Sequence, residues 1–343
     1  MKTIRVAVIG AGSFGRNHIR VLREIPDAKL VGIFDIDKEQ CQQVSQKYGV
    51  AAFNSIESAF TQADCAIVAT PTVTHEAVAS ILLEAGLDVL VEKPIASSSA
   101  AGERLERLAG RYGRILQVGH LERFNPAVSA LETARTLPLF FEIHRLSLFS
   151  ARSLDIDVVL DLMIHDLDIV LHITREMPTD IQAAGISVLS QRVDIANVRL
   201  SFPSGCVTNL TASRVSTEKV RKLRLFQPGE YLSVDYGRQE IVRLAVRKNE
   251  LNGEFVSKFE GNSLKTGVLP EIGFERLSVT LGEPLKLELE SFLTCVRDRT
   301  PPRVTAGDAT HALRVAEAII AKIGQHASVV SNTIGNYAGR LRT

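Results

Sequence analysis

Short runs of β-branched and aliphatic residues alternate with helical stretches through the first third of the chain. The apolar runs predict strands, and the stretches between them carry apolar residues three or four positions apart, which indicates amphipathic helices. Strands that alternate with helices are typical of a parallel sheet covered by helices on both faces. The predicted strands are residues 4–9, 30–34, 65–69, 88–91 and 115–118.

The rhythm changes after Pro126. From there, one strand and one strongly apolar helix are followed by a long run of strand-like segments and then by two helices. Consecutive strands without intervening helices predict a largely antiparallel sheet. In chain order, these segments are residues 139–148, 157–173, 181 to about 259, 285–297 and 306–325.

The two patterns predict an α/β protein of two domains. Residues 1–121 are expected to form a doubly wound Rossmann sheet, and residues 122–343 an α+β domain with a large, mostly antiparallel sheet. The length of 343 residues agrees with two domains. Because no low-complexity linker separates the halves, we expect a tight join at which a site can form.

Composition excludes several classes of partner. The chain has 40 Lys and Arg against 39 Asp and Glu, so no net charge draws it to nucleic acid or to an anionic membrane. Its four cysteines, Cys41, Cys65, Cys206 and Cys295, show no C-x-x-C spacing and are expected to be reduced. The apolar run at residues 6–11 is too short to cross a bilayer. We therefore expect a cytoplasmic protein.

The first predicted strand leads into the glycine pattern G-x-G-x-x-G, which opens a helix. The first glycine of such a turn permits the sharp bend, the second lets backbone approach a pyrophosphate, and the third allows close helix packing. Glycine turns after strands are common, so the pattern alone is weak. The candidate cofactor-binding residues of this turn are Gly10, Gly12, Ser13, Phe14 and Gly15.

Asp35 strengthens the dinucleotide interpretation. It ends the second strand about 20 residues after the last glycine, where a carboxylate accepts hydrogen bonds from the adenosine ribose. Its charge would repel the 2′-phosphate of NADP, so the predicted cofactor is NAD. The neighbouring Asp37 is expected to cap the next helix.

Two more polar groups directly follow predicted strands, where ligands bind in open parallel sheets. Thr70 and Pro71 follow the third strand, and His75 lies one turn into the next helix. A lone histidine in such a place is more often an internally satisfied residue than a ligand. Glu92 and Lys93 end the fourth strand before a proline, and this places a cation where the nicotinamide should lie.

The predicted helix 157–173, DVVLDLMIHDLDIVLHI, is apolar except for one polar stripe. At about 100° per residue, the stripe covers an arc of roughly 60°. A helix this apolar is buried, so the stripe must face a partner, a cavity or water. Asp166 lies off it and is expected to meet solvent or a neighbouring element. The stripe contains Asp157, Asp161, His165, Asp168 and His172.

Three interpretations of the stripe compete. It is an internally paired ridge without chemistry, a metal site built on Asp161 and His165, or an acid–base pair in which Asp161 orients the His165 ring. The metal site is disfavoured because no third histidine or cysteine ligand is clearly placed, and we expect no metal. A dinucleotide domain opposite the stripe favours the acid–base pair.

Together these residues resemble the glucose-fructose oxidoreductase / inositol dehydrogenase (Gfo/Idh/MocA) family, and the resemblance covers essentially the whole chain. It implies a Rossmann domain followed by an open-faced sheet, one face of which is commonly buried in a homodimer or homotetramer. The matching segments are GAGSFGRNH at 10–18, TPTVTH at 70–75, EKP at 92–94 and D-x-x-x-H at 161–165.

The resemblance also implies roles. In relatives, the EKP lysine lies beside nicotinamide and substrate, and the D-x-x-x-H pair supplies the acid–base residue, so we expect Lys93, Asp161 and His165 to be catalytic. VGHLERFNPAV at 118–128 and DLMIHDLDI at 161–169 look like the bacterial UDP-N-acetylglucosamine 3-dehydrogenases. That subgroup oxidises the sugar 3-hydroxyl to a ketone, which a pyridoxal-phosphate aminotransferase can convert to an amine.

In the expected reaction, His165 removes the hydroxyl proton, the carbon-bound hydrogen leaves as hydride to NAD, and Lys93 stabilises the alkoxide. Burial should lower the pKa of Lys93, so it can share in proton transfer. Arginine can chelate a diphosphate. The candidates for substrate recognition are Arg123, Asn125, Arg152 and Asp168.

The basic stretch 214–224, with Lys219, Arg221, Lys222 and Arg224, could also meet a phosphate, although a solvated strand face is the simpler interpretation. Two rival functions stay open. One is a dehydrogenase of another UDP-sugar, a UDP-sugar acid or an inositol-like polyol. The other is a dinucleotide-sensing regulator without catalysis, which would not need Lys93, Asp161 and His165 together.

Overall fold

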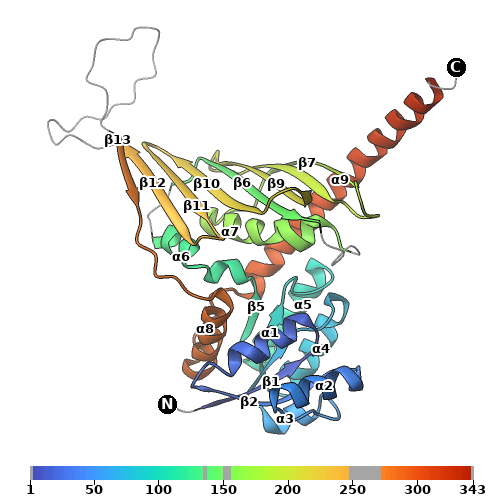
Figure 1. Ribbon diagram of the computed structural model, residues 1–343, viewed down its shortest axis with the longest axis vertical. Coiled ribbons are helices and arrows are strands. Elements are labelled where there is room, and N and C mark those ends of the chain that lie inside the picture. Colours follow the sequence, from blue (N-terminus) through green and yellow to red (C-terminus); the bar gives the residue numbers. More distant parts are fainter. Residues whose placement is uncertain (1–2, 134–136, 150–155, 247–271, 341–343) are drawn as a thin grey trace.

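The computed structural model describes residues 3–133, 137–149, 156–246 and 272–340. It contains a parallel sheet near the N-terminus and a larger sheet above it, with helices between and around them (Figure 1). The expected fold class, a Rossmann domain with a second domain built on a mostly antiparallel sheet, is confirmed.

The first sheet is parallel throughout, in the order β2-β1-β3-β4-β5. The chain leaves β1 toward β2 on one side and returns to β3 on the other, so the carboxyl ends of β1 and β3 flank the point where ligands bind in such sheets. The predicted strands agree to within one or two residues. Their bounds are β1 Ile4–Ile9, β2 Ala28–Phe34, β3 Cys65–Val68, β4 Asp88–Glu92 and β5 Leu116–Gly119.

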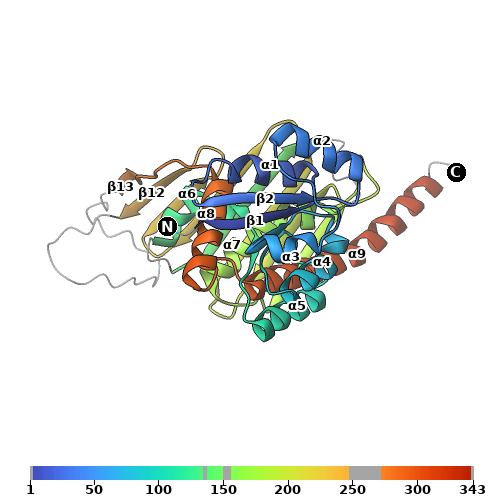
Figure 2. The same cartoon turned by 90° about the horizontal axis from the view of Figure 1, so that it is seen from below.

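Side-chain alternation sends the apolar residues of each strand to two different cores. Val6 and Val8 pack under one helical layer, whereas Ala7 and Ile9 pack under the other. Figure 2 shows these two layers on either side of the strands. One contains α1 (Ser13–Leu22), α2 (Lys38–Tyr48) and α8 (Pro284–Asp298), and the other α3 (Ser58–Gln62), α4 (Thr72–Glu84) and α5 (Ser99–Tyr112).

Helix α8 comes from the far end of the chain but packs on the first sheet. Leu289, Phe292 and Leu293 of this helix share a core with β1 and α1. The expected division at residue 121 therefore does not separate all of the packing, because the chain returns to the first sheet after the second has been built.

The second sheet has the order β13-β12-β11-β10-β6-β9-β8-β7 in the described residues. Neighbouring strands are antiparallel except β6 and β9, which are parallel. The bounds are β6 Phe140–Leu148, β7 Asp180–Ile186, β8 Ile195–Ser201, β9 Val207–Ser216, β10 Val220–Gln227, β11 Glu230–Asp235, β12 Glu240–Val246 and β13 Ile272–Arg276.

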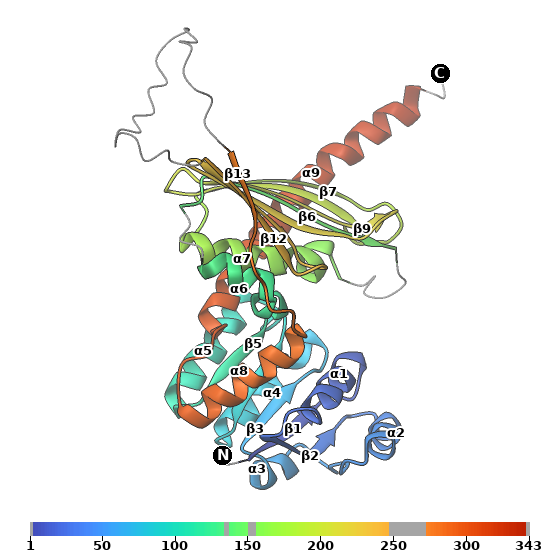
Figure 3. The same ribbon diagram turned by 60° about the vertical axis from the view of Figure 1, so that its left-hand side comes forward.

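One face of this sheet is covered and the other is open. Phe141 and Ile143 of β6, like Leu223 and Leu225 of β10, point into the core shared with the helices below. Figure 3 shows α6 (Pro126–Thr133) and α7 (Ile164–Thr174) beneath the sheet. The open face carries exposed side chains such as Phe226.

The segment predicted as one α-helix, residues 157–173, is not regular. A π-helical stretch, η2 (Val159–Met163), precedes α7, and the N–H of Ile164 reaches back five residues to the carbonyl of Val159. Such bulges are rare and are frequent at functional sites. The prediction that the polar stripe follows α-helical spacing is therefore wrong for the first turn, which contains Asp161.

The last part of the chain differs from expectation at two places. Helix α9 runs over Ala306–Arg340, well beyond the predicted end at 325, and leaves the body of the molecule past β7 (Figure 1). Strand β13 was not predicted, and the expected strand residues from 247 to 259 lie outside the described residues. No described helix is long and apolar enough to cross a membrane.

Candidate active site

The glycine turn after β1 has the geometry that a dinucleotide requires. Gly10 has a positive φ of 106°, and a Cβ there would overlap the carbonyl oxygen of Ala69. A Cβ on Gly15 would overlap the carbonyl of Gly10, so this contact between helix and turn also needs glycine. Gly12 has open space where a Cβ would be, which leaves room for a pyrophosphate to approach the backbone.

Helix α1 begins in this turn without a capping side chain. Its N-cap is Gly12, no side chain accepts a hydrogen bond from its first N–H groups, and its first turn has no acidic residue. Free N–H groups and the positive end of the helix dipole favour an anion at this position. The turn therefore fits NAD, with Ser13 and the 59% exposed Phe14 at its mouth.

Asp35 follows β2 and is tied to the same turn. One carboxylate oxygen accepts from the N–H of Ala11 at 2.6 Å and from Gln40 Nε2 at 3.2 Å, and the other accepts from the N–H of Asp37 at 2.9 Å. Asp37 caps α2 by accepting from the N–H of Gln40, as expected. Asp35 thus stands beside the turn with acceptor capacity left for a ribose hydroxyl.

The residues after β3 form a hydrogen-bonded corner. The hydroxyls of Thr70 and Thr74 lie 2.9 Å apart, and the Thr74 hydroxyl also donates to the carbonyl of Pro71. The buried ring of His75 lies 2.8 Å from the carbonyl of Pro94 and 2.9 Å from that of Thr70. His75 therefore joins the two loops that follow β3 and β4, and both of its ring nitrogens are used inside the protein.

Glu92 anchors the end of β4 to α1. Its Oε1 lies 2.6 Å from Nε2 of the buried His18. Burial raises the pKa of Glu92, but the hydrogen bond and charge of His18, with the charge of Lys93, outweigh burial and leave the pKa lowered. Sequence analysis did not single out His18, because its partner lies 74 positions away.

Lys93 points from the end of β4 to the π-helical turn. Its Nζ donates to the carbonyl of Asp161 at 2.7 Å, and it lies 3.6 Å from Asp161 Oδ1. The side chain is 12% exposed, and burial lowers its pKa against the opposing charges of Asp161 and Glu92. A lysine whose pKa is lowered by burial gives up its proton more readily than an exposed lysine.

Asp161 does not orient His165 as expected. Its carboxylate faces Lys93, and the buried Nδ1 of His165 has no hydrogen-bond partner among the described residues. The physical reason is the π-helical turn, which changes the angle between positions 161 and 165 and directs the Asp161 carbonyl to Lys93. Lys93 and Asp161, not Asp161 and His165, are the paired groups.

His165 lies half-buried next to a second histidine. The ring of His120, which follows β5, meets the His165 ring edge-on with centroids 6.1 Å apart. Burial, and after it the charges of Lys93 and Arg145, lower the pKa of His165 well below the ordinary value. Burial and the charges of Lys93 and Arg123 lower the pKa of His120 to about 3. Both rings are therefore neutral at physiological pH, as a general base must be.

Both halves of the chain match known families. Residues 4–120 match an oxidoreductase family with an NAD-binding Rossmann fold, and residues 143–227 match the GFO/IDH/MocA C-terminal domain. The UDP-N-acetylglucosamine 3-dehydrogenase of Acidithiobacillus ferrooxidans is 33% identical over 299 residues, which are 87% of this chain and 90% of that protein. The chain belongs to the GFO/IDH/MocA oxidoreductase family. It is an NAD-dependent oxidoreductase that acts on CH–OH groups.

A second relative and a solved structure are also similar to this chain. The NAD-dependent scyllo-inositol 2-dehydrogenase of Bacillus subtilis is 25% identical over 91% of this chain and 92% of its own length. The solved structure of the Acidithiobacillus ferrooxidans enzyme superposes with a TM-score of 0.84 at 30% identity, covering 95% of this chain and 99% of that one.

Within this GFO/IDH/MocA site, Arg123 is a buried residue that faces acidic side chains. Its side chain is 1% exposed, and its guanidinium lies 3.4 Å from Glu132 and 3.5 Å from Asp168. It also donates to the carbonyl of Arg303. Its Nε has no hydrogen-bond partner in the described residues, and Arg123 lines a small pocket of about 180 Å³ with Asp168 and His172, so a substrate contact at Arg123 stays a prediction.

The other recognition candidates fare differently. Asn125 is buried at the start of helix α6. Its side-chain N–H donates to Glu122, and its side-chain oxygen accepts from the N–H of Ala127. Asp168 is 1% exposed at its side chain and faces Arg123, and a substrate contact at Asn125 or Asp168 stays a prediction. Arg152 lies outside the described residues.

The rest of the stripe is also paired internally. Asp157 accepts from the N–H of Val193, and His172 Nε2 lies 3.2 Å from Glu132. Asp166 was expected to meet either solvent or a neighbouring element. It meets a neighbouring element, because it accepts two hydrogen bonds from Arg145 of β6. In the described part of the chain, no group of three or more His, Cys, Asp or Glu could hold a metal.

Two residues beside the site were missed. His120 ends β5, as Lys93 ends β4, and its position at a strand end was a usable signal. Arg145 lies on the covered face of β6, in the alternation that begins with Phe141 and Ile143. A charged residue at an inward position of a strand marks a buried polar network.

Proposed function

We propose that the protein oxidises a secondary hydroxyl of a nucleotide-linked sugar to a ketone, with C3 of UDP-N-acetylglucosamine as the substrate position. The observation that supports this choice best is the likeness to the Acidithiobacillus ferrooxidans UDP-N-acetylglucosamine 3-dehydrogenase, which extends across both domains. The inositol dehydrogenase of comparable coverage is less similar, at 25% identity.

The proposed catalytic residues are Lys93, Asp161 and His165. His165 is a neutral imidazole that can take the hydroxyl proton, because burial and nearby cations keep its pKa low. Lys93 supplies a positive charge for the developing alkoxide, and Asp161 holds the ammonium by its carbonyl and carboxylate. Bound NAD supplies the hydride acceptor.

Cofactor selection is assigned to the first domain. Gly10, Gly12 and Gly15 give the turn its shape, and Asp35 would accept from a ribose hydroxyl and repel a 2′-phosphate. Ser13, Phe14, Thr70, Pro71, His75 and Glu92 remain proposed neighbours of the cofactor.

An inositol-like polyol is the second candidate, supported by the full-length likeness to scyllo-inositol 2-dehydrogenase. A UDP-sugar acid is chemically close to the first candidate and differs by a carboxylate on the sugar.

The setting of the enzyme is also part of the proposal. We expect it to act in the cytoplasm, where the free thiols of Cys41, Cys65, Cys206 and Cys295 stay reduced. The open face of the second sheet has a hollow of about 650 Å³, which is lined by residues of strands β6 to β9, such as Phe140 and Thr211. This face is the proposed interface of a homodimer or homotetramer. The keto product is suited to a pyridoxal-phosphate aminotransferase as the next enzyme.

The test uses the purified protein with NAD and UDP-N-acetylglucosamine that carries deuterium at C3. We expect absorbance of the reduced cofactor to appear, deuterium to be found in that cofactor, and turnover to be slower than with unlabelled sugar. Reduction without deuterium transfer would mean another hydroxyl reacts. Turnover of scyllo-inositol with none of any UDP-sugar would overturn the nucleotide-sugar assignment in favour of the polyol.

A further inference from the structure

Strand β10 places an arginine on the covered face of the second sheet. Leu223 and Leu225 point inward and are fully buried, and Arg221 lies on the same face by the period of two. In the register of β10 with β6, Arg221 stands directly opposite Arg145. Two cations at directly opposed positions repel each other, so this pair needs compensating anions.

The two arginines are compensated unequally. Arg145 donates two hydrogen bonds to Asp166, at 2.7 and 2.8 Å, and one to Glu122 at 2.8 Å. Among the described residues, Arg221 pairs only with Glu122 Oε1, 3.6 Å away, and this is the same oxygen that Arg145 already uses. The Nε of Arg221 is buried without a partner in the described residues. The protein therefore leaves most donors of this guanidinium unpaired.

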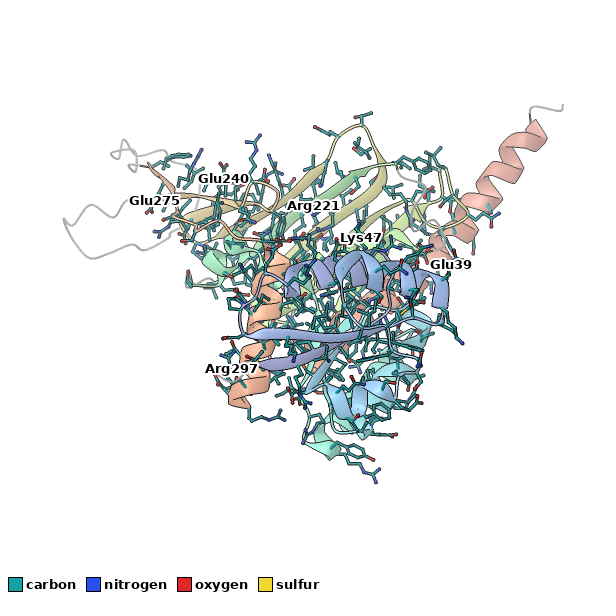
Figure 4. The ribbon with its side chains drawn as sticks, turned by 60° about the horizontal axis from the view of Figure 1, so that its bottom comes forward. Glu39, Lys47, Arg221, Glu240, Glu275 and Arg297 are labelled. Atoms are coloured by element: carbon teal, nitrogen blue, oxygen red, sulfur yellow. The ribbon has the colours of Figure 1, made fainter. Side chains whose placement is uncertain are left out.

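Arg221 is also placed to meet a substrate. Its side chain is 35% exposed, whereas that of Arg145 is 2% exposed, so Arg221 is the member of the pair that a ligand can reach. The charge of Arg221 is one of those that lower the pKa of His165, so it lies within electrostatic reach of the proposed base. Figure 4 shows Arg221 near the middle of the sheet, away from Glu240 and Glu275 at its β12–β13 edge.

We propose that Arg221 binds an oxyanion of the substrate, a phosphoryl group of the nucleotide or a carboxylate of the sugar, through the guanidinium donors that the protein leaves unpaired. An arginine edge matches either oxyanion with two parallel hydrogen bonds. The inference rests on the proposed function, since a neutral polyol offers no anion. It adds Arg221 to Arg123 as a candidate for substrate recognition, and Arg221 is the more accessible of the two, at 35% against 1% side-chain exposure.

The basic stretch 214–224 therefore divides by face. Lys222 and Arg224 alternate with the buried leucines and lie on the open face, where Arg224 is 3.2 Å from Glu142. The solvated strand face expected for the stretch holds for these two residues. Arg221 differs from these two residues because it lies on the covered face of β10, with Leu223 and Leu225.

The variant Arg221→Gln tests the assignment, with Arg243→Gln as the matched control. Arg243 also lies on the covered face, opposite the buried Leu232. It lies nearer the β13 edge of the sheet, where it pairs with Glu230 and Glu275. For Arg221→Gln with NAD present, we expect the KM for UDP-N-acetylglucosamine and the Kd for UDP to rise about tenfold to a hundredfold. The Kd for NAD should stay unchanged, and Arg243→Gln should behave as wild type.

A second readout separates recognition from a merely structural role. Loss of a cation near His165 should raise the pKa of that residue, so the acid limb of the pH profile should move to higher pH in Arg221→Gln. Should this variant fail to fold, Arg221→Lys keeps the charge without the fork and is expected to show the same rise in KM and Kd, in smaller measure.

The outcomes distinguish the two proposals. If wild type oxidises UDP-N-acetylglucosamine and Arg221→Gln binds UDP and substrate normally, the Arg221 assignment is overturned and the proposed function stands. If wild type oxidises inositols and no UDP-sugar, the proposed function fails, and unchanged UDP binding by the variant would remove the Arg221 site as well. Weaker binding of UDP itself identifies the phosphoryl group, whereas loss confined to a UDP-sugar acid identifies the carboxylate.

Discussion

The helical segment 159–174 carries acidic and histidine side chains both in its first turn and in its later turns. The two groups differ in the hydrogen-bond partners that the protein gives them. At the first turn, Lys93 meets Asp161 at the π-helical bulge, and the Nδ1 of nearby His165 has no partner. Further along, Asp166 is held by Arg145 through two hydrogen bonds, whereas Asp168 faces Arg123 with one oxygen and leaves the other without a hydrogen-bond partner in the described residues.

His165 and Asp166 differ in whether the protein supplies the hydrogen-bond partners of their side chains. A buried carboxylate with its full set of donors is a structural element, and removing its partner costs stability. A buried imidazole with an unused nitrogen is available to another molecule. The contrast predicts that substitutions at the first turn cost activity, and substitutions further along cost stability.

The largest expected effect is that of Lys93→Met. This change removes the cation proposed to stabilise the alkoxide, so turnover should fall about 10³-fold or more. The Kd for NAD, measured by titration, should stay near wild type, because the lysine does not hold the pyrophosphate. Near-normal turnover would show that Lys93 is not catalytic.

His165→Asn should lower kcat on the order of 10² to 10⁴-fold, the range for loss of a positioned base. In wild type, oxidation should rise with pH as His165 loses its proton, and burial should place that limb below the ordinary histidine value. The limb should vanish in His165→Asn. Asp161→Asn should cost less than His165→Asn, because the Asp161 carbonyl still accepts from Lys93. Full activity in both variants would leave the base elsewhere.

Arg145→Met tests the paired side of the comparison. It leaves Asp166 and Glu122 buried without their cation, and the expected loss in the free energy of unfolding is about 3–5 kcal/mol. The exposed pair of Arg104 and Glu76 is the control, since Arg104→Met should cost at most about 1 kcal/mol. Equal shifts in the denaturation midpoints would contradict the distinction between completed and surface pairs.

Cofactor choice should depend on Asp35. We expect wild type to bind NAD at least about tenfold more tightly than NADP, because the carboxylate stands beside the turn where the adenosine ribose lies. Asp35→Ser should narrow the ratio. Equal affinities of wild type for both cofactors would remove the assignment of Asp35.

Sequence alone predicted the features whose causes are local. The glycine turn, the Asp37 cap and the five parallel strands follow from residues within a few positions of each other. The partners of Asp166 and Asp168 were not predictable in this way, because Arg145 and Arg123 lie 21 and 45 positions away from them in the sequence. The π-helical turn has no signal in the apolar period, so the Asp161–His165 pairing was misjudged.

The smallest expected effect on catalysis is at Asp168, whose carboxyl group is buried beside Arg123. Burial raises the pKa of its carboxyl group to about 7, and the cation of Arg123 opposes this only in part. The folded protein then binds a proton that the unfolded chain has lost. Ionisation of Asp168 therefore costs stability progressively between about pH 4 and pH 7, with no cost below that window and a constant cost above it.

Asp168→Asn cannot ionise and lacks this slope. The unfolding free energy of Asp168→Asn minus that of wild type should rise between pH 4 and pH 7 and stay constant above pH 7. The altered Arg123 contact adds an offset to this difference that does not depend on pH. Denaturation midpoints at several pH values measure the slope, and steady-state kinetics should give a KM within about twofold of wild type, since Asp168 is 1% exposed. A tenfold rise in KM with no change in slope would return Asp168 to the substrate site and break the contrast between the two ends of the helix.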